Sequence, residues 1–147
     1  MIENIQILVS FLDQQEIDYL LEFSGNRGLH IWILFDDKIT RQDAFIIFQS
    51  ILKQSNINLN TQHFSLDKYP KSMYSSQGTD KGTGVKIPLS FHEKSKRYSL
   101  LFKTLEEFNI LNFDITELNV DFVESQYSIL DDYSLQNKDE LFKKLAI

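Results

Sequence analysis

The sequence predicts an α+β domain with a mostly antiparallel sheet and flanking helices. Apolar residues recur at helical spacing over residues 2–16, whereas residues 29–35 are almost entirely apolar, as in a buried strand. The expected elements follow in the order helix, strand, strand, helix, strands, helices, which favours the α+β class. With 147 residues, of which 42% are hydrophobic, the chain is long enough for one domain with a real core. We find no repeats and no internal boundary, and therefore expect a single domain over residues 1–147.

Helix and strand patterns are clear in the N-terminal half of the chain. The expected elements are a helix over residues 2–16, strands over 18–23 and 29–35, and a helix that begins after Thr40. Thr40 resembles an N-cap, with Asp43 three residues later and apolar residues at helical spacing beyond it. Two glycines and an asparagine in residues 24–28 indicate a loop between the two strands.

The C-terminal half is expected to form a hairpin followed by helices. The expected elements are a short strand over residues 64–69, a long loop over 70–84, hairpin strands over 85–91 and 98–102, and helices near 104–111, 115–125 and 137–145. Pro70 and three glycines predict the loop. The three helices are expected to begin at capping residues Thr104, Asp114 and Asn137.

Charge is unevenly distributed along the chain. The formal net charge is −6, but residues 62–103 hold eight basic and three acidic side chains, against seven and eighteen elsewhere. An acidic protein is a poor general nucleic-acid binder, because affinity for phosphates comes mostly from neutralising their charge. The basic segment can still hold phosphates locally, or it can be a solvated, lysine-rich surface hairpin.

The composition excludes several classes of protein. The chain has no cysteine, which excludes disulfides, thiolate metal sites and thiol catalysis. No apolar run approaches the ~20 residues that a membrane span needs, and the first residues lack the basic region of a secretory signal. We therefore expect a cytoplasmic protein with no membrane partner.

The most distinctive stretch is FSGNRGLHIW, residues 23–32, around the loop between the first two strands. A glycine-rich turn can wrap an anion through backbone N–H groups that a side chain would otherwise block. Ser24 and His30 flank the loop, Arg27 lies inside it, and strand alternation places His30 opposite the main apolar row. A hydroxyl, a guanidinium and an imidazole together suit a phosphate clamp. The alternative is an ordinary turn with a buried, hydrogen-bonded histidine.

Residues 23–36, FSGNRGLHIWILFD, resemble the second motif of the archaeo-eukaryotic primase superfamily. That motif is a Ser-Gly-x-x-Gly-x-His segment between two strands, and its serine and histidine contact the triphosphate of the incoming nucleotide. The resemblance implies that Ser24 and His30 bind nucleoside triphosphates, with Arg27 as a lesser contributor. It also implies a partial primase-polymerase fold with an RRM-like catalytic core.

A second stretch, GTGVKIPLSFH at residues 82–92, resembles a segment of the bacterial primase-polymerase branch, which includes CRISPR-associated and conflict-system forms. In that branch a Phe-Pro-Lys-Gln segment precedes it, and here residues 69–72 read YPKS. Strand alternation places Lys86 and His92 on one face. The resemblance implies that both join His30 around the phosphates if the strands are neighbours; otherwise they lie on an exposed hairpin edge. Together the two matches span residues 17–102.

Polymerisation requires divalent cations, and the resemblance implies Mg²⁺ or Mn²⁺ held by carboxylates. The family's first motif is an Asp-x-Asp pair on a strand before the first helix, and no such pair precedes Ser24. Glu16 and Asp18 have the right spacing but fall where the next strand begins, so we expect the chain to lack the first-motif strand region. Asp67 is the best match to the single acid of the third motif; otherwise it is a loop-edge carboxylate paired with a neighbouring lysine.

The expected function is nucleotide or template handling in DNA or RNA primer synthesis, as in DNA replication. The expected reaction is nucleotidyl transfer, as in a primase or DNA polymerase, and we expect the chain by itself to be inactive. Three explanations for the missing pair stay open: a partner chain supplies it, the chain is a degenerate primase-like protein, or it is a fragment. The expected partners are nucleoside triphosphates, a DNA or RNA template, and a partner chain or homodimer. The non-catalytic alternative is an interaction module that uses apolar residues within 108–123, most of which are expected in the core.

Overall fold

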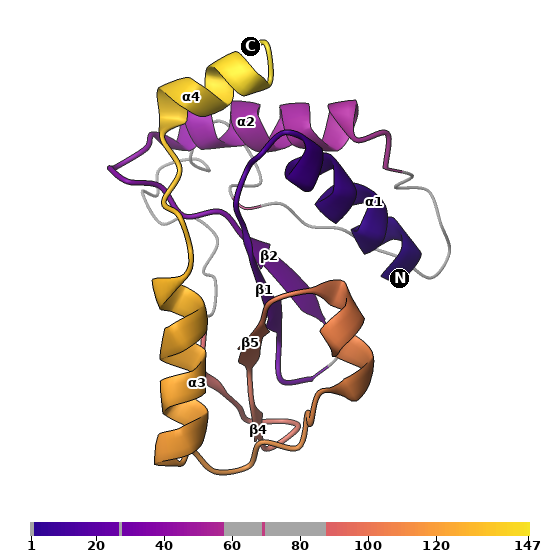
Figure 1. Cartoon of the computed structure of the whole chain (residues 1–147), viewed down its shortest axis with the longest axis vertical. Helices are drawn as coiled ribbons and strands as arrows, with labels where there is room; N and C mark the ends of the chain where they lie inside the picture. Colours follow the sequence, from indigo (N-terminus) through magenta and orange to yellow (C-terminus); the bar gives the residue numbers. More distant parts are fainter. Residues whose placement is uncertain (1, 27, 58–68, 70–87) are drawn as a thin grey trace, which may run out of the picture. The chain divides into compact units, whose positions relative to one another are not determined.

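The computed structural model describes residues 2–26, 28–57, 69 and 88–147, and its helices and antiparallel strands confirm the predicted α+β class (Figure 1). The chain divides into two compact units. The helical unit comprises Met1–Ile17, Phe35–Val85 and Leu135–Ile147, and the sheet unit comprises Asp18–Leu34 and Lys86–Ser134. A single domain over residues 1–147 stays a prediction.

An antiparallel sheet of three strands forms the centre of the sheet unit. Its strands are β1 (Leu20–Phe23), β2 (Leu29–Trp32) and β5 (Leu100–Phe102), in the order β2-β1-β5. All residues of β1 and β5 are buried, so the central strand and one neighbour supply the core. The register places Glu22 of β1 between His30 of β2 and Leu101 of β5. The two expected N-terminal strands are therefore present, each shorter than predicted.

The predicted hairpin of residues 85–91 with 98–102 is confirmed where Phe91 pairs with Tyr98 and is wrong for Leu100–Phe102, while residues 85–87 lie outside the described residues. The observed hairpin joins β3 (Phe91–His92) to β4 (Arg97–Tyr98), whereas Leu100–Phe102 leaves it and pairs with β1. Burial explains the difference, because every side chain of β5 is removed from water against the central strand. The predicted strand over 64–69 lies almost wholly, and the loop over 70–84 wholly, outside the described residues.

A short 3₁₀ helix and an α-helix follow the sheet. The 3₁₀ helix η1 spans Leu105–Ile110, and α3 spans Val120–Asp131 (Figure 1). The helix expected over 115–125 begins later, because Asn119 rather than Asp114 caps it by accepting a hydrogen bond from the backbone N–H of Phe122 at 2.8 Å. The preceding segment pairs with the hairpin instead, where the Ile115 carbonyl accepts from the N–H of Tyr98 at 2.7 Å.

Helix α3 is joined to the sheet by a buried amide. The Gln126 side chain accepts a hydrogen bond from the backbone N–H of Leu101 at 2.6 Å and donates to the carbonyl of the same residue at 3.1 Å. These bonds satisfy backbone groups on the outer edge of β5 as a neighbouring strand would. The sheet edge is thus closed by a side chain at this position.

Tyr133, just after α3, ties the ends of the β1–β2 segment together. Its hydroxyl accepts from the Leu34 N–H at 2.7 Å and lies 3.1 Å from the Leu34 carbonyl and 3.4 Å from that of Asp18. Burial, and secondarily the negative charge of Asp18, raise the pKa of Tyr133 to about 12, against the lowering effect of the Leu34 hydrogen bond.

Comparison with Tyr133→Phe should show a stability difference that depends on pH. The folded state keeps the phenol protonated, so the contribution is present below the ordinary pKa near 10 and is lost as the pH rises through the folded value of about 12. Urea unfolding at pH 8 should favour the wild type by about 1 kcal/mol for the lost hydrogen bonds. We expect the advantage to shrink by pH 11; an unchanged difference would contradict this account.

Three helices make up the described secondary structure of the helical unit. They are α1 (Ile2–Gln14), α2 (Arg41–Gln54) and α4 (Lys138–Lys144). Helices α1 and α2 each bury an apolar stripe, which includes Leu12 in α1 and Ile47 in α2, and α4 buries Leu141. The predicted caps Thr40 and Asn137 are confirmed, since Thr40 accepts from the Asp43 N–H and Asn137 from the Glu140 N–H, both at 3.1 Å, whereas the Thr104 side chain makes no capping hydrogen bond to η1. A bridge between Phe35 and Gln136 adds a short extended contact.

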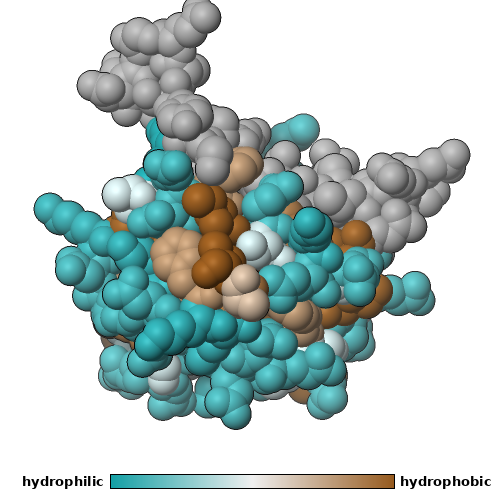
Figure 2. Space-filling view, turned by 90° about the horizontal axis from the view of Figure 1, so that it is seen from above, coloured by the Kyte–Doolittle hydropathy of each residue, from teal (hydrophilic) through white to brown (hydrophobic). Residues whose placement is uncertain are grey.

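On the face shown in Figure 2, hydrophilic side chains surround a small group of hydrophobic ones. Two apolar side chains of the sheet unit are strongly exposed, Ile110 at 84% and Val120 at 71%. Within the described part of the chain, no helix is both long and apolar enough to cross a membrane.

Candidate functional site: the loop between β1 and β2

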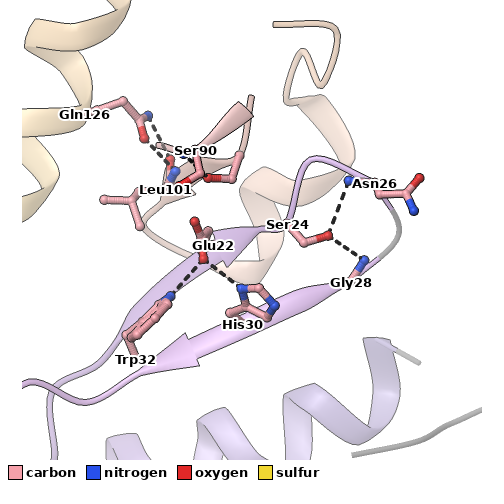
Figure 3. A network of polar contacts seen from close by, with 10 residues as sticks. Glu22, Ser24, Asn26, Gly28, His30, Trp32, Ser90, Leu101 and Gln126 are labelled. Carbon is pink, nitrogen blue, oxygen red and sulfur yellow. Dashed lines mark hydrogen bonds and ion pairs between the residues drawn. The ribbon is translucent and has the colours of Figure 1, made fainter. Parts of the chain in front are cut away.

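The loop between β1 and β2 is closed by its own serine. The Ser24 Oγ atom accepts hydrogen bonds from the backbone N–H groups of Gly28 at 2.9 Å and Asn26 at 3.3 Å, and the Ser24 N–H donates to the Gly28 carbonyl (Figure 3). Two loop amides are therefore occupied by Ser24 and do not point outward as an anion cradle would require. The serine oxygen still carries a hydrogen, which these bonds leave for a ligand.

His30 leaves the loop on β2 and is held by a buried carboxylate. Its Nδ1 atom lies 2.8 Å from Oε1 of Glu22, and the same oxygen accepts from Nε1 of Trp32 at 2.9 Å (Figure 3). The Glu22 side chain is 2% exposed, whereas that of His30 is 41% exposed. The three side chains share one sheet face because Glu22 and His30 are register partners and Trp32 lies two residues further along β2. The ring is thus anchored on one side and open on the other.

Glu22 was missed by sequence reasoning. A single acid within the apolar run LLEF was the available signal, since a buried carboxylate needs partners. The alternation that placed His30 and Trp32 on one face could have been extended across the loop to Glu22. The alternative was an ordinary turn with a buried, hydrogen-bonded histidine. His30 is hydrogen-bonded, as this alternative requires, but it is not buried.

The β3–β4 hairpin packs against the loop through His92, Ser95 and Arg97. The Ser95 hydroxyl donates to the Gly25 carbonyl, and the backbone N–H of Ser95 donates to Nδ1 of His92 at 3.2 Å. A Cβ atom on Gly25 would lie 3.3 Å from Cβ of His92 and 3.2 Å from the Arg97 carbonyl oxygen. Gly25 also has a φ of 93°, so this close approach depends on glycine.

Arg97 is a second residue that sequence reasoning did not select. Its guanidinium donates to the Asn26 carbonyl at 3.4 Å, lies 3.5 Å from Asp114 and stacks over Phe23 with 5.6 Å to the ring centroid. These contacts join the loop to the hairpin. The available signal was its position in the basic segment, five residues after His92 on the returning strand.

The structure brings Ser24, His30 and His92 to one loop. The other expected site residues, Arg27, Lys86 and the metal-ligand candidate Asp67, lie outside the described residues. Whether the phosphate-binding set includes them stays a prediction.

A metal site is not assembled by the residues that the structure describes. No group of three or more His, Asp or Glu side chains there could hold an ion. Asp18 has the spacing of an Asp-x-Asp pair to Glu16. Its carboxylate accepts hydrogen bonds from the backbone N–H groups of Tyr19 and Ser134.

Comparison with known proteins identifies the family to which the chain belongs. No curated protein matches the chain. A family model described as the archaeo-eukaryotic primase domain of TOTE conflict systems matches residues 1–125, which include the whole β1–loop–β2 segment and the hairpin. The chain therefore belongs to the archaeo-eukaryotic primase family of TOTE conflict systems, as a primase-like nucleotidyltransferase domain.

Proposed function

We propose that this domain binds the triphosphate of a nucleoside triphosphate at the loop between β1 and β2, with His30 as the principal side chain. The observation that carries the proposal is the half-exposed His30 ring, anchored at Nδ1 by Glu22 so that Nε2 is left for a ligand. The Ser24 hydroxyl and His92 lie at the same loop and supply further donors. Arg27 and Lys86 are proposed to add positive charge there.

The proposed reaction is nucleotidyl transfer in primer synthesis on a DNA or RNA template. Members of the family generally depend on divalent metal ions, and Asp67 is our candidate for one carboxylate ligand. The Asp-x-Asp pair is proposed to come from a partner chain. In this scheme the chain binds and orients the nucleotide phosphates, while the rest of the metal site lies outside the described residues.

Calorimetric titration with ATP, dATP and inorganic tripolyphosphate, with and without Mn²⁺, tests nucleotide binding. His30→Ala should weaken binding by about tenfold or more, because a hydrogen bond to a charged group contributes roughly 1.5–3 kcal/mol. Tyr127→Ala, an exposed aromatic position on α3, is the control and should bind as the wild type does. Undiminished affinity in a folded His30→Ala protein would overturn the assignment.

A non-catalytic interaction module is the second candidate, favoured by the exposed apolar side chains of Ile110 and Val120. Phe108 and Phe113 in the same region belong instead to an aromatic cluster with Phe23 and Phe102. If the wild type binds neither nucleotide nor tripolyphosphate, this candidate takes precedence. Val120→Asp should then abolish partner binding and leave the fold intact.

A further inference from the structure

The carboxylate of Glu22 is the least expected polar group in the sheet unit. It lies in the central strand at 2% exposure, and its Oε1 atom lies 2.8 Å from Nδ1 of His30 and accepts from the Trp32 ring N–H at 2.9 Å. Burying a carboxylate is costly unless it is well paired, and both of its partners here are side chains of β2. The arrangement fixes the rings of His30 and Trp32 relative to each other, with their centroids 6.2 Å apart and their planes nearly perpendicular.

When Glu22 is ionised, this contact indicates which nitrogen of His30 carries a proton. An ionised carboxylate only accepts hydrogen bonds, so the hydrogen between the two groups belongs to Nδ1 of the ring. In the neutral ring the other nitrogen, Nε2, then has a lone pair and no hydrogen. Phosphate oxygens are also acceptors. A neutral His30 anchored in this way can therefore not donate to a phosphate through Nε2.

We propose that Glu22 is a positioning residue that couples triphosphate binding to the uptake of a proton by His30. When Nε2 gains its proton, the imidazolium donates from Nδ1 to Glu22 and from Nε2 to a phosphate oxygen, and both bonds are charge-assisted. The proton comes from solvent, and no covalent bond other than N–H is formed. The inference rests on the proposed function, since it requires a phosphate at His30.

The surroundings of the pair support this assignment. Within the described residues, the ionisable side chain that contacts His30 is Glu22. On the β5 side the register partner of Glu22 is the apolar Leu101, and α3 contributes the uncharged Gln126 there. The hairpin brings two further basic groups, His92 and Arg97, to Gly25 and Asn26 of the loop. Glu22 is thus the group in direct contact that can stabilise a proton on His30.

The test is calorimetry with inorganic tripolyphosphate in two buffers of different ionisation enthalpy, at pH 5.5 and pH 7.5. The difference in apparent heat gives the number of protons taken up on binding. Relative to His30→Gln, whose neutral amide can donate without titrating, the wild type should take up additional protons, approaching one per site, at pH 7.5 and fewer at pH 5.5. Glu22→Gln keeps an oxygen acceptor but removes the charge, so it should weaken binding several-fold at pH 7.5 and less at pH 5.5.

A second measurement on the unmodified protein keeps the inference testable if Glu22→Gln fails to fold. Nitrogen-15 NMR of the histidine rings should show His30 protonated at Nδ1 alone in the free protein at pH 7.5 and at both nitrogens with tripolyphosphate bound. Binding with no proton uptake beyond that of His30→Gln, or with Nε2 unprotonated, overturns the coupling and leaves the proposed function standing. No tripolyphosphate binding by the wild type overturns both.

Discussion

Gly25→Ala is expected to destabilise the folded protein by about 2 kcal/mol or more and to weaken tripolyphosphate binding at least tenfold. Gly25 has a φ of 93°, a conformation that L side chains rarely adopt. An added methyl group would also lie 3.2 Å from the Arg97 carbonyl oxygen and 3.3 Å from the Ser99 backbone nitrogen, and backbone atoms cannot yield easily. The loop would have to separate from the hairpin. Urea unfolding followed by circular dichroism measures the first effect, and calorimetry the second.

Gly28→Ala is the matched control in the same loop. Among the described residues that lie beyond its chain neighbours, its added Cβ would meet Ser24 atoms alone, the nearest being Oγ at 3.4 Å, which is ordinary van der Waals contact. The change in the free energy of unfolding should stay within about 1 kcal/mol, because the backbone conformation there suits an L residue. Equal losses of stability in the two variants would show that the close packing of the hairpin against Gly25 does not hold the loop.

Phe102→Ala should cost about 3–5 kcal/mol of unfolding free energy, the usual range for a phenylalanine removed from a core. The ring is 1% exposed on β5, opposite Leu21 of the central strand, and packs 5.9 Å from the ring of Phe108. Its loss leaves a cavity at the point where the sheet meets the aromatic cluster. Denaturant unfolding of the two proteins under one set of conditions measures the difference.

Phe91→Ala provides the comparison for the same chemical change on the surface. Phe91 is 36% exposed on the hairpin and contacts Tyr98 edge to face. We expect a loss of about 1 kcal/mol or less, because little apolar area returns to water. A loss for Phe102→Ala as small as this would contradict the placement of β5 in the core.

Local patterns in the sequence were sufficient where the interactions span only a few residues. Thr40 and Asn137 cap their helices as predicted, since each side chain bonds the N–H three residues later. The loop with Ser24 at its start was predicted for the same reason, and the resemblance to the archaeo-eukaryotic primases that began there is confirmed by the family match over residues 1–125. The predicted cap Asp114 was wrong. Asn119 can cap a helix equally well, and the segment between the two residues hydrogen-bonds to Tyr98 instead of forming a helix.

Strand pairing could not be read from the same patterns. Residues 98–102 were predicted as one strand, yet Tyr98 belongs to the hairpin and Leu100–Phe102 to the three-stranded sheet. An apolar run shows that a strand will be buried, but not which partner will bury it. The competition is decided by the total area removed from water, which depends on segments far apart in the chain.

By itself the sequence determined the α+β class, the primase family, and the serine, glycines and histidine of the loop, because these depend on residue type and short-range spacing. Only the tertiary structure decided how that loop is held. Glu22 meets His30 and Trp32 across the sheet, and Arg97 and Ser95 reach the loop from some 70 residues away, at sequence separations of 71 and 70 from Asn26 and Gly25. The register of β1 and β2 and the packing of the hairpin bring these groups together, and neither is encoded by residues that are neighbours in the chain.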